Sequence, residues 1–211
     1  MNIKNHQKFL KLFYNLGFEN PNFLIRYFNY SLLSSSPLEN ALPWWSWKAI
    51  DEISKSHFND TFEYGSGGST LFIGNISNNH LSVEDDPKWF NLVKNKLENL
   101  SLESIELIYE SPDFIDLNSF TNSLYLTSLS SPKDLIIIDG QDHWSPSSSK
   151  TARHICFYYA EKFIKPGGII ILDDSWRYKD IRVKNHAKFY KCFESIGPCR
   201  IGVTSTDFYY Y

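Results

Sequence analysis

The sequence predicts an α/β protein whose sheet is mainly parallel and covered by helices on both faces. Residues 135–138 and 169–172 are apolar at every position. Strands with one face in water alternate apolar and polar residues, whereas continuously apolar strands are covered on both sides. From residue 61 onward, short apolar runs also alternate with segments of helical periodicity, which is the pattern of repeated strand–helix–strand units.

The predicted strands and helices follow one another in regular alternation. Strands are expected at residues 61–64, 81–84, 105–109, 135–138 and 169–172, with helices at residues 69–76, 87–100, 113–126 and 149–164 between them. In the second helix, Trp89, Val93, Leu97 and Leu100 are spaced to share one face. After the fifth strand we expect a helix near residues 182–196. A hairpin of residues 199–203 and 207–211, with its turn at residues 204–206, would then close the chain.

Residues 1–60 are predicted to form a helical extension, and residues 61–211 the α/β domain. Helical spacing is present around residues 9–16, and a second helix is expected from Asn20-Pro21 to about residue 34. Pro43 can occupy the first turn of a third helix that runs to Ile53. Trp44 and Trp47 would share a face of that helix, so they either pack on the sheet or form a lid over a ligand.

Composition limits the class of protein. The chain has 211 residues, of which 42% are hydrophobic and 21% charged, which predicts a folded domain rather than a disordered one. The net charge of −3 gives no reason to expect nucleic-acid binding. Three cysteines without metal-ligand spacing indicate reduced thiols. Because no signal core or membrane-length apolar stretch is found, we expect a cytoplasmic protein without a membrane partner.

Polar residues follow four of the five predicted strands at the point where each strand ends. They are residues 63–70 (Glu-Tyr-Gly-Ser-Gly-Gly-Ser-Thr), 84–87 (Glu-Asp-Asp-Pro), 139–143 (Asp-Gly-Gln-Asp-His) and 173–176 (Asp-Asp-Ser-Trp). In open parallel sheets, ligands bind beyond the carboxyl ends of the strands. The sequence therefore predicts a binding site at this edge.

The first two of these segments indicate a nucleoside ligand. Gly65, Gly67 and Gly68 would allow a tight turn and a close approach of the backbone to a ligand. A carboxylate about 20 residues beyond such a turn is placed to accept hydrogen bonds from ribose hydroxyls, and Glu84 lies 21 residues after Glu63. NAD is disfavoured because Thr70 stands where the dinucleotide pattern needs glycine, and no Gly-Lys-Ser/Thr sequence of a P-loop follows.

These segments resemble the motifs of the class I S-adenosylmethionine-dependent methyltransferases. The resemblance covers residues 61–174. It rests on Phe62-Glu63-Tyr64-Gly65-Ser66-Gly67-Gly68-Ser69-Thr70, on Ser82-Val83-Glu84, on Asp134 to Gly140, and on Lys165-Pro166-Gly167-Gly168 before Asp173-Asp174. The sequence is most similar to an uncharacterised subgroup with this first motif after a Pro-Trp segment, as at Pro43-Trp44. Ser69 stands where many members have a third glycine.

The resemblance implies a Rossmann-like three-layer sandwich of seven strands, ordered 3-2-1-4-5-7-6 with strand 7 antiparallel. It implies that S-adenosylmethionine is the cofactor. Glu63 and Gly65, Ser66, Gly67, Gly68 and Ser69 would hold its methionine end. Glu84 would hold the ribose diol, and Asp85 would face adenine.

Asp139 and His143 are the candidate catalytic residues, because both follow the fourth strand, where the sheet opens toward a substrate. Either side chain can act as a general base for an acceptor that carries a proton. The expected reaction is methyl transfer to an oxygen or nitrogen atom of a small molecule. Arg177, Lys179, Arg182, Lys184, Lys188 and Lys191 form a basic run that would attract an anionic substrate.

Three alternatives stay open. Asp139, Asp173 and Asp174 are oxygen ligands of the type that Mg²⁺ prefers, and catechol-type O-methyltransferases place metal ligands at corresponding positions. Asp174 replaces the asparagine of that pattern, and we assign no metal ligand. An aminopropyltransferase-like enzyme has a comparable acidic segment after the fourth strand. A non-catalytic cofactor-binding or scaffold domain would also keep the glycine loop.

Overall fold

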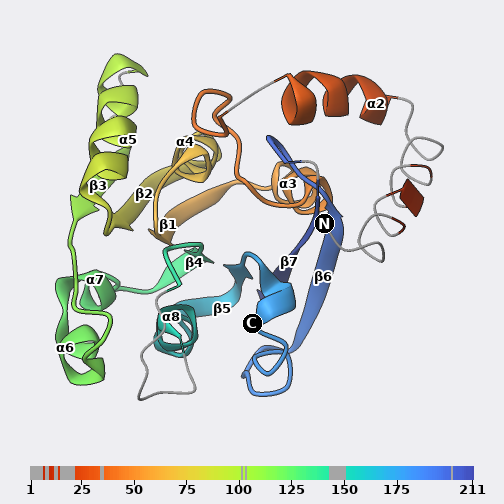
Figure 1. Ribbon diagram of the computed structural model, residues 1–211. Helices are drawn as coiled ribbons and strands as arrows, with labels where there is room; N and C mark the ends of the chain where they lie inside the picture. The colour runs from red at the N-terminus through yellow and green to blue at the C-terminus, as the bar shows by residue number, and fades with distance from the viewer. Residues whose placement is uncertain are drawn as a thin grey trace.

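A seven-stranded sheet forms the centre of the computed structural model, which describes residues 22–33, 36–100, 102, 104–142, 151–200 and 202–211, with residues 7, 10, 11 and 14. The strand order is β3-β2-β1-β4-β5-β7-β6, as predicted (Figure 1). The strands are β1 (Phe58–Tyr64), β2 (Ser77–Glu84), β3 (Ile105–Tyr109), β4 (Lys133–Ile138), β5 (Ile164–Leu172), β6 (Phe189–Ile196) and β7 (Val203–Tyr210). Strands β1 to β5 pair in parallel, whereas β7 runs antiparallel to both β5 and β6.

Helices lie on both faces of this sheet (Figure 1). They are α2 (Asn22–Tyr27), a π-helical turn (Phe28–Leu32), α3 (Trp47–Ile53), α4 (Gly68–Gly74), α5 (Pro87–Leu100), α6 (Leu117–Asn122), α7 (Leu124–Thr127), α8 (Ala152–Ala160) and a 3₁₀ turn (Ser175–Arg177). Among the described residues, no helix is long and apolar enough to span a bilayer.

The apolar strands β4 and β5 supply side chains to the two larger hydrophobic cores, as their sequences predict. Ile136 and Ile138 point into one core with α7 and α8, whereas Leu135 and Ile137 point into the other with α3 and α4. Successive side chains of a strand lie on opposite faces, so an uninterrupted apolar run is needed where both faces are covered.

The C-terminal prediction is wrong in three places. The first strand of the closing hairpin, expected at residues 199–203, is β6 at residues 189–196. Residues 189–196, expected to be helical, form the edge strand β6, which packs aromatic side chains on β7, with Phe193 and Phe208 4.7 Å apart between ring centroids. Residues 204–206, expected to form the hairpin turn, lie inside β7. These residues are buried there, and each hydroxyl group has a partner: Thr204 donates to Asp174, Thr206 donates to Asp173, and Ser205 shares a hydrogen bond with Ser175.

Several helix boundaries also differ from the prediction. The helix expected at residues 113–126 is divided into α6 and α7, because Ser123 has an extended backbone and caps α7 through its side chain. The third N-terminal helix begins at Trp47, after the N-cap Ser46, so Pro43 precedes it. Helix α8 is shorter than predicted, and Leu100 is exposed rather than part of the buried face of α5. Most of the helix expected at residues 9–16 lies outside the described residues.

Candidate functional site at the carboxyl edge of the sheet

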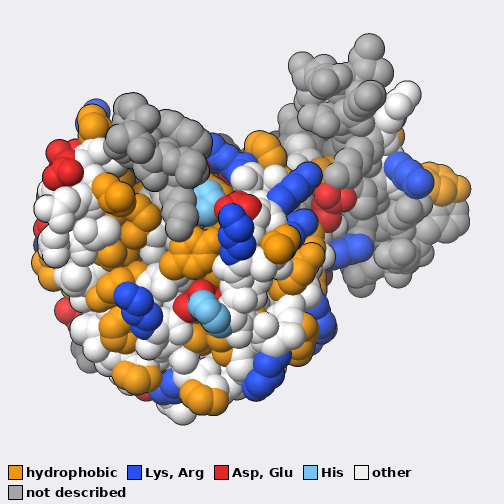
Figure 2. Space-filling model, turned by 90° about the horizontal axis from the view of Figure 1, so that it is seen from below, with side chains coloured by type: hydrophobic (Ala, Val, Ile, Leu, Met, Phe, Trp, Pro, Cys, Tyr) orange, Lys and Arg blue, Asp and Glu red, His pale blue; other side chains and the backbone are white. Residues whose placement is uncertain are grey.

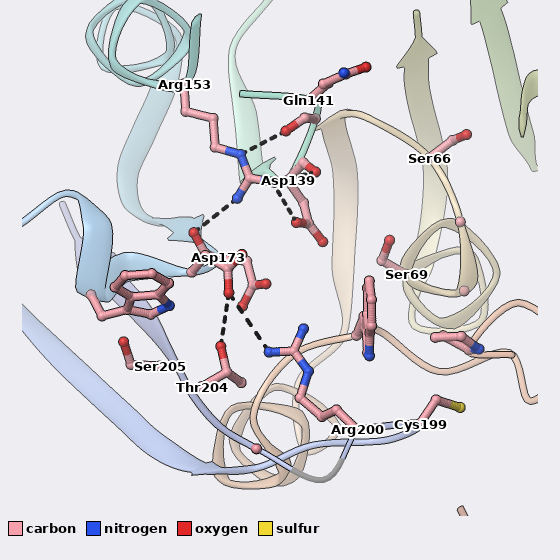
Figure 3. Close-up of a pocket in the computed structure, with 18 of the residues that line it drawn as sticks. Ser66, Ser69, Asp139, Gln141, Arg153, Asp173, Cys199, Arg200, Thr204 and Ser205 are labelled. Carbon is pink, nitrogen blue, oxygen red and sulfur yellow. Dashed lines mark hydrogen bonds and ion pairs between the residues drawn. The ribbon is translucent and has the colours of Figure 1, made fainter. Parts of the chain in front are cut away.

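A cavity of 1090 Å³ lies at the predicted edge of the sheet, beyond the carboxyl ends of β1, β4 and β5. Its wall includes the glycine loop after β1, the loop after β4 and the acidic end of β5. The start of β7, the segment before α3 and the loop between β6 and β7 complete it. Figure 3 shows side chains from these segments pointing toward one another. Segments that are far apart in the chain therefore form one site.

Glu63 lies beneath the glycine loop and is fully buried. The hydroxyl groups of Ser69 and Thr70 donate to its two carboxylate oxygens, the second over 2.7 Å. Thr70 Oγ1 in turn accepts from the backbone N–H of Gly67 at 2.8 Å. Glu63 therefore fixes the shape of the loop from below, while Ser66 to Ser69 form the cavity wall.

Two of the loop glycines are required by the protein's own backbone. Gly65 has a φ of +96°, and a Cβ there would lie 2.8 Å from Gly140 Cα. A Cβ on Gly68 would lie 2.1 Å from the carbonyl oxygen of Leu42, so the segment before α3 packs directly on the loop. A Cβ on Gly67 would instead make ordinary contact with the Trp89 ring at 3.6 Å. Any steric block of a ligand by Gly67 substitutions stays a prediction.

Glu84 is buried at the carboxyl end of β2, next to the equally buried Asp85. Its Oε1 accepts from the backbone N–H groups of Asp85 and Asp86, both at 3.0 Å. Its Oε2 accepts from the Ser66 hydroxyl at 2.6 Å. Burial raises the pKa of Glu84 to about 7, although these hydrogen bonds favour the ionised form. Glu84 therefore lies behind the cavity wall and reaches it through Ser66.

Asp139 extends from the end of β4 into the cavity. The Trp45 indole N–H donates to its Oδ2 at 2.9 Å, and Arg153 Nη2 lies 3.4 Å from its Oδ1. Burial raises the pKa of Asp139 to about 6, while Arg153 and then Trp45 lower it. The carboxyl group is thus poised to gain or lose a proton near neutral pH.

Asp173 and Asp174 close the cavity at the end of β5. Asp173 accepts from Thr206 Oγ1 at 2.7 Å, and burial followed by the like charge of Asp139 raises its pKa well above the usual range. Asp174 accepts from Thr204 Oγ1 at 3.0 Å and lies 3.7 Å from the Arg200 guanidinium. In the described part of the chain, no group of three or more His, Cys, Asp or Glu side chains is arranged to hold a metal ion.

Some of the predicted site residues line the cavity, and others lie behind its wall. Ser66, Gly67, Gly68, Ser69 and Asp139 line the cavity. Glu63, Gly65, Glu84 and Asp85 lie directly behind them and shape the loop and the end of β2. His143 lies outside the described residues.

The basic run is not on the cavity wall. Arg182 pairs with the buried Asp207 at 2.6 Å, and Arg177 lies 3.7 Å from Asp142. Of the three tryptophans before β1, Trp44 lines the cavity and is 51% exposed, whereas Trp45 and Trp47 are buried.

Sequence reasoning missed the contributions of Trp45, Trp89, Arg153 and Arg200. Trp89 donates from Nε1 to the Ser66 carbonyl at 2.6 Å and so fixes the glycine loop. One signal was available: Arg153 is the only Lys, Arg, Asp or Glu of α8, whose other residues are mostly apolar, and charged residues are rarely buried unless they are paired. Arg200 had no such signal, because it lies in a loop.

Comparisons with known proteins identify the fold. No family model and no curated protein matches the sequence. The structure is similar to that of the O-methyltransferase TomG from Streptomyces achromogenes, which is involved in tomaymycin synthesis and was solved with S-adenosylmethionine. That likeness has a TM-score of 0.59 and 13% identity over 84% of this chain and 90% of TomG.

Two further solved structures show the same architecture. An O-methyltransferase from Bacillus cereus, solved in complex with S-adenosylhomocysteine, has a TM-score of 0.57 and 16% identity over 77% of each chain. A putative rRNA-methylase from Clostridium thermocellum has a TM-score of 0.52 and 14% identity over 77% of this chain and 95% of that one. With the observed strand order, these likenesses show that the chain has the Rossmann-like fold of the class I methyltransferases.

Proposed function

We propose that the protein is an S-adenosylmethionine-dependent methyltransferase that acts on an oxygen or nitrogen atom of a small molecule. The observation that carries the proposal is the cavity itself, which connects the Ser66–Glu84 pair at the glycine loop with the Asp139 carboxyl group. The sequence motifs and the fold of the structural neighbours support the same function. The resemblance of the first motif supports the further proposal that the chain is a member of the Phe-Glu-x-Gly-Ser-Gly-Gly-Ser-Thr subgroup.

The residues present fit this cofactor. A carboxylate at the end of β2 is the acceptor that a ribose diol requires, and Ser66 already donates a hydroxyl group to Glu84 in the geometry of such a contact. In the proposal, Glu84 holds the ribose, Asp85 faces adenine, and the loop from Gly65 to Ser69, shaped by Glu63, holds the methionine end. When bound, S-adenosylmethionine supplies an activated methyl group together with its own leaving group.

Asp139 is the proposed general base. Its pKa of about 6 leaves the carboxylate ionised at neutral pH, so it can accept the proton of the acceptor's hydroxyl or ammonium group. Asp173 is unsuited to that task, because burial and its acidic neighbours favour its protonated form. His143 remains the second proposed catalytic residue, on its position in the sequence alone.

The cavity wall supports a small, partly apolar acceptor. Trp44 and Trp176 line it and are 51% and 56% exposed, so indole surface is available to a ligand. An anionic group on the acceptor would meet Arg200, which lies over the Trp44 ring at 4.7 Å, rather than the predicted basic run. The volume of 1090 Å³ is at the upper end of small-molecule sites and suits a cofactor beside an acceptor.

The charge distribution bears on the partner. On the face seen in Figure 2, Lys and Arg side chains are scattered among hydrophobic and acidic ones, which supports a small molecule over a nucleic acid.

The segment before α3 bears on the domain organisation. Residues 37 and 42 pack on Gly68, and Trp44 lines the cavity. These contacts support the proposed division into residues 1–60, which contribute a lid, and residues 61–211, which form the methyltransferase domain.

Calorimetric titration with S-adenosylmethionine and S-adenosylhomocysteine, followed by a metabolite screen, tests the proposal. We expect both compounds to bind, and one metabolite to gain the mass of a methyl group as S-adenosylhomocysteine is released. Release of methylthioadenosine from the decarboxylated cofactor would replace the proposal by an aminopropyltransferase. Binding without any turnover would leave a cofactor-binding domain, and absence of binding would overturn the proposal. Repeating the assay with a chelator and with added Mg²⁺ decides whether a metal takes part.

A further inference from the structure

We propose that Trp45 and Arg153 are positioning residues that together hold the Asp139 carboxylate ionised and aimed into the cavity. The inference rests on the proposed function, because it gives Asp139 the role of base. It adds two residues, one far before Asp139 in the chain and one after it, whose side-chain hydrogen bonds in the described structure go to the ends of β4 and β5 rather than to the glycine loop or Glu84.

Trp45 restrains one oxygen of the carboxylate. Its indole N–H donates to Asp139 Oδ2 at 2.9 Å across a sequence separation of 94 residues. The indole is fully buried, and the Trp45 carbonyl oxygen lies where a Cβ on Gly197 would be only 2.1 Å away. Burial in the core holds the ring in place, and the close packing at Gly197 holds the backbone that carries it, so the indole N–H is a donor with a set direction.

Arg153 restrains the other oxygen and the backbone that carries it. Its Nε donates to the Gly140 carbonyl at 2.7 Å, its Nη2 to the Asp139 carbonyl at 3.1 Å, and its Nη1 to the Asp173 carbonyl at 3.0 Å. Nη2 also lies 3.4 Å from Asp139 Oδ1. The planar guanidinium thus links the ends of β4 and β5, a geometry that lysine cannot reproduce. Figure 3 shows these contacts beside the cavity.

Asp139 needs such partners because its other charged neighbours are mostly acidic. Glu63 from β1 and Asp174 after β5 raise its pKa, and Asp173 is coupled to it by like charge. Arg200 lies on the far side of Asp174, at 3.7 Å from that carboxylate. Arg153 is therefore the cation that pairs directly with Asp139 among the described residues, and Trp45 supplies the neutral hydrogen bond that completes the restraint.

The direct test is a carbon-13 NMR titration of the Asp139 carboxyl group, assigned by its loss in Asp139→Asn. Trp45→Phe removes the N–H donor but keeps an aromatic ring, and Arg153→Met removes the charge. Each should raise the pKa of Asp139 by about one unit, because each removes a partner that favours the ionised form. Arg153→Lys should restore part of the shift but not the three carbonyl contacts.

Matched controls separate this effect from general damage. Trp47→Phe alters a second buried tryptophan, whose indole N–H has no hydrogen-bond partner in the described structure. Arg182→Lys alters an arginine that pairs with Asp207 instead. Both should leave the pKa of Asp139 unchanged, with folding checked by thermal melts.

Once a substrate is known, the acidic limb of the kcat profile should move to higher pH in Trp45→Phe, and raising the pH should restore activity. An unchanged Asp139 pKa in both Trp45→Phe and Arg153→Met would overturn the inference even if methyl transfer is found. Conversely, the NMR titration decides the inference even if no methyl transfer occurs, so the two failures are distinguishable.

Discussion

Glu84 and Asp139 are carboxyl groups at the edge of the same sheet, the first buried and the second partly exposed to the cavity, and different kinds of partner hold them. Glu84 is surrounded by neutral donors, namely two backbone N–H groups and the Ser66 hydroxyl, and burial raises its pKa to about 7. Asp139 has an arginine and a fixed indole N–H, and its pKa is about 6.

The difference fits two different tasks. A group that binds a neutral diol needs a fixed position, which short local contacts provide, and it needs unused acceptor capacity. Glu84 accepts three hydrogen bonds, whereas an ionised carboxylate has about four lone-pair sites. A group that accepts a proton also needs a controlled pKa near neutrality, which a charged partner provides. The proposal is therefore that the Glu84 side of the cavity binds the cofactor and that the Asp139 side accepts the proton.

The largest expected effect is on turnover at the Asp139 side. Asp139→Asn keeps the size of the side chain and removes the base, so kcat should fall by about 10²–10⁴-fold on the substrate that the screen identifies. Steady-state kinetics at saturating cofactor measure this. Turnover within a factor of about three of wild type would show that alignment alone drives the reaction.

Next in size is the effect of a side chain at the glycine loop. Gly65→Ala places a Cβ against the Gly140 backbone at a positive φ, and should cost about 3 kcal/mol of unfolding free energy. Gly67→Ala would avoid such a clash, since its Cβ would lie 3.6 Å from the Trp89 ring, but the φ of +159° still disfavours a side chain, so this variant should lose less stability than Gly65→Ala without being neutral. Urea denaturation compares the two variants. Equal losses of unfolding free energy would mean that the backbone conformation of the loop, rather than the contact between residue 65 and Gly140, determines the loss of stability.

The pH dependence of stability tests the Glu84 side. A raised pKa means that the folded protein binds the Glu84 proton more tightly than the unfolded chain. This contribution to stability is complete below pH 4.5 and is lost as pH rises through about 7. Glu84→Gln removes the ionisation, so its stability relative to wild type should grow by about 2 kcal/mol between pH 5 and pH 8. If the difference in unfolding free energy between Glu84→Gln and wild type stayed constant from pH 5 to pH 8, the raised pKa of Glu84 would be contradicted.

The sequence allowed the Glu84 side to be predicted and left the Asp139 side incomplete, for a physical reason. The partners of Glu63 and Glu84 lie within about 20 residues, so the loop motif and the strand spacing include them. Trp45 is 94 residues away from Asp139, and no local pattern reports such a contact. The same distinction explains the fold: β1 to β5 have continuous apolar runs or clear strand–helix alternation, and all were predicted.

The edge strand β6 shows where local patterns fail. Its first four residues are exposed, and it contains one lysine and three aromatic residues at spacings that also fit a helix, so its pairing with β7 decides its conformation. The hydroxyl-rich residues 204–206 have the composition of a turn, and their hydrogen bonds to Asp173 and Asp174 become visible only in the folded structure.

The measurement that tests the division of tasks most directly is a calorimetric titration of S-adenosylhomocysteine into wild type, Glu84→Gln and Asp139→Asn. Glu84→Gln keeps an acceptor for the Asp85 and Asp86 N–H groups but loses a charge-assisted hydrogen bond to ribose, so the Kd should rise about tenfold or more. Asp139→Asn should bind within a factor of about two of wild type, since a base contributes to turnover rather than to product affinity. Equal weakening in both variants, or none in Glu84→Gln, would contradict the account.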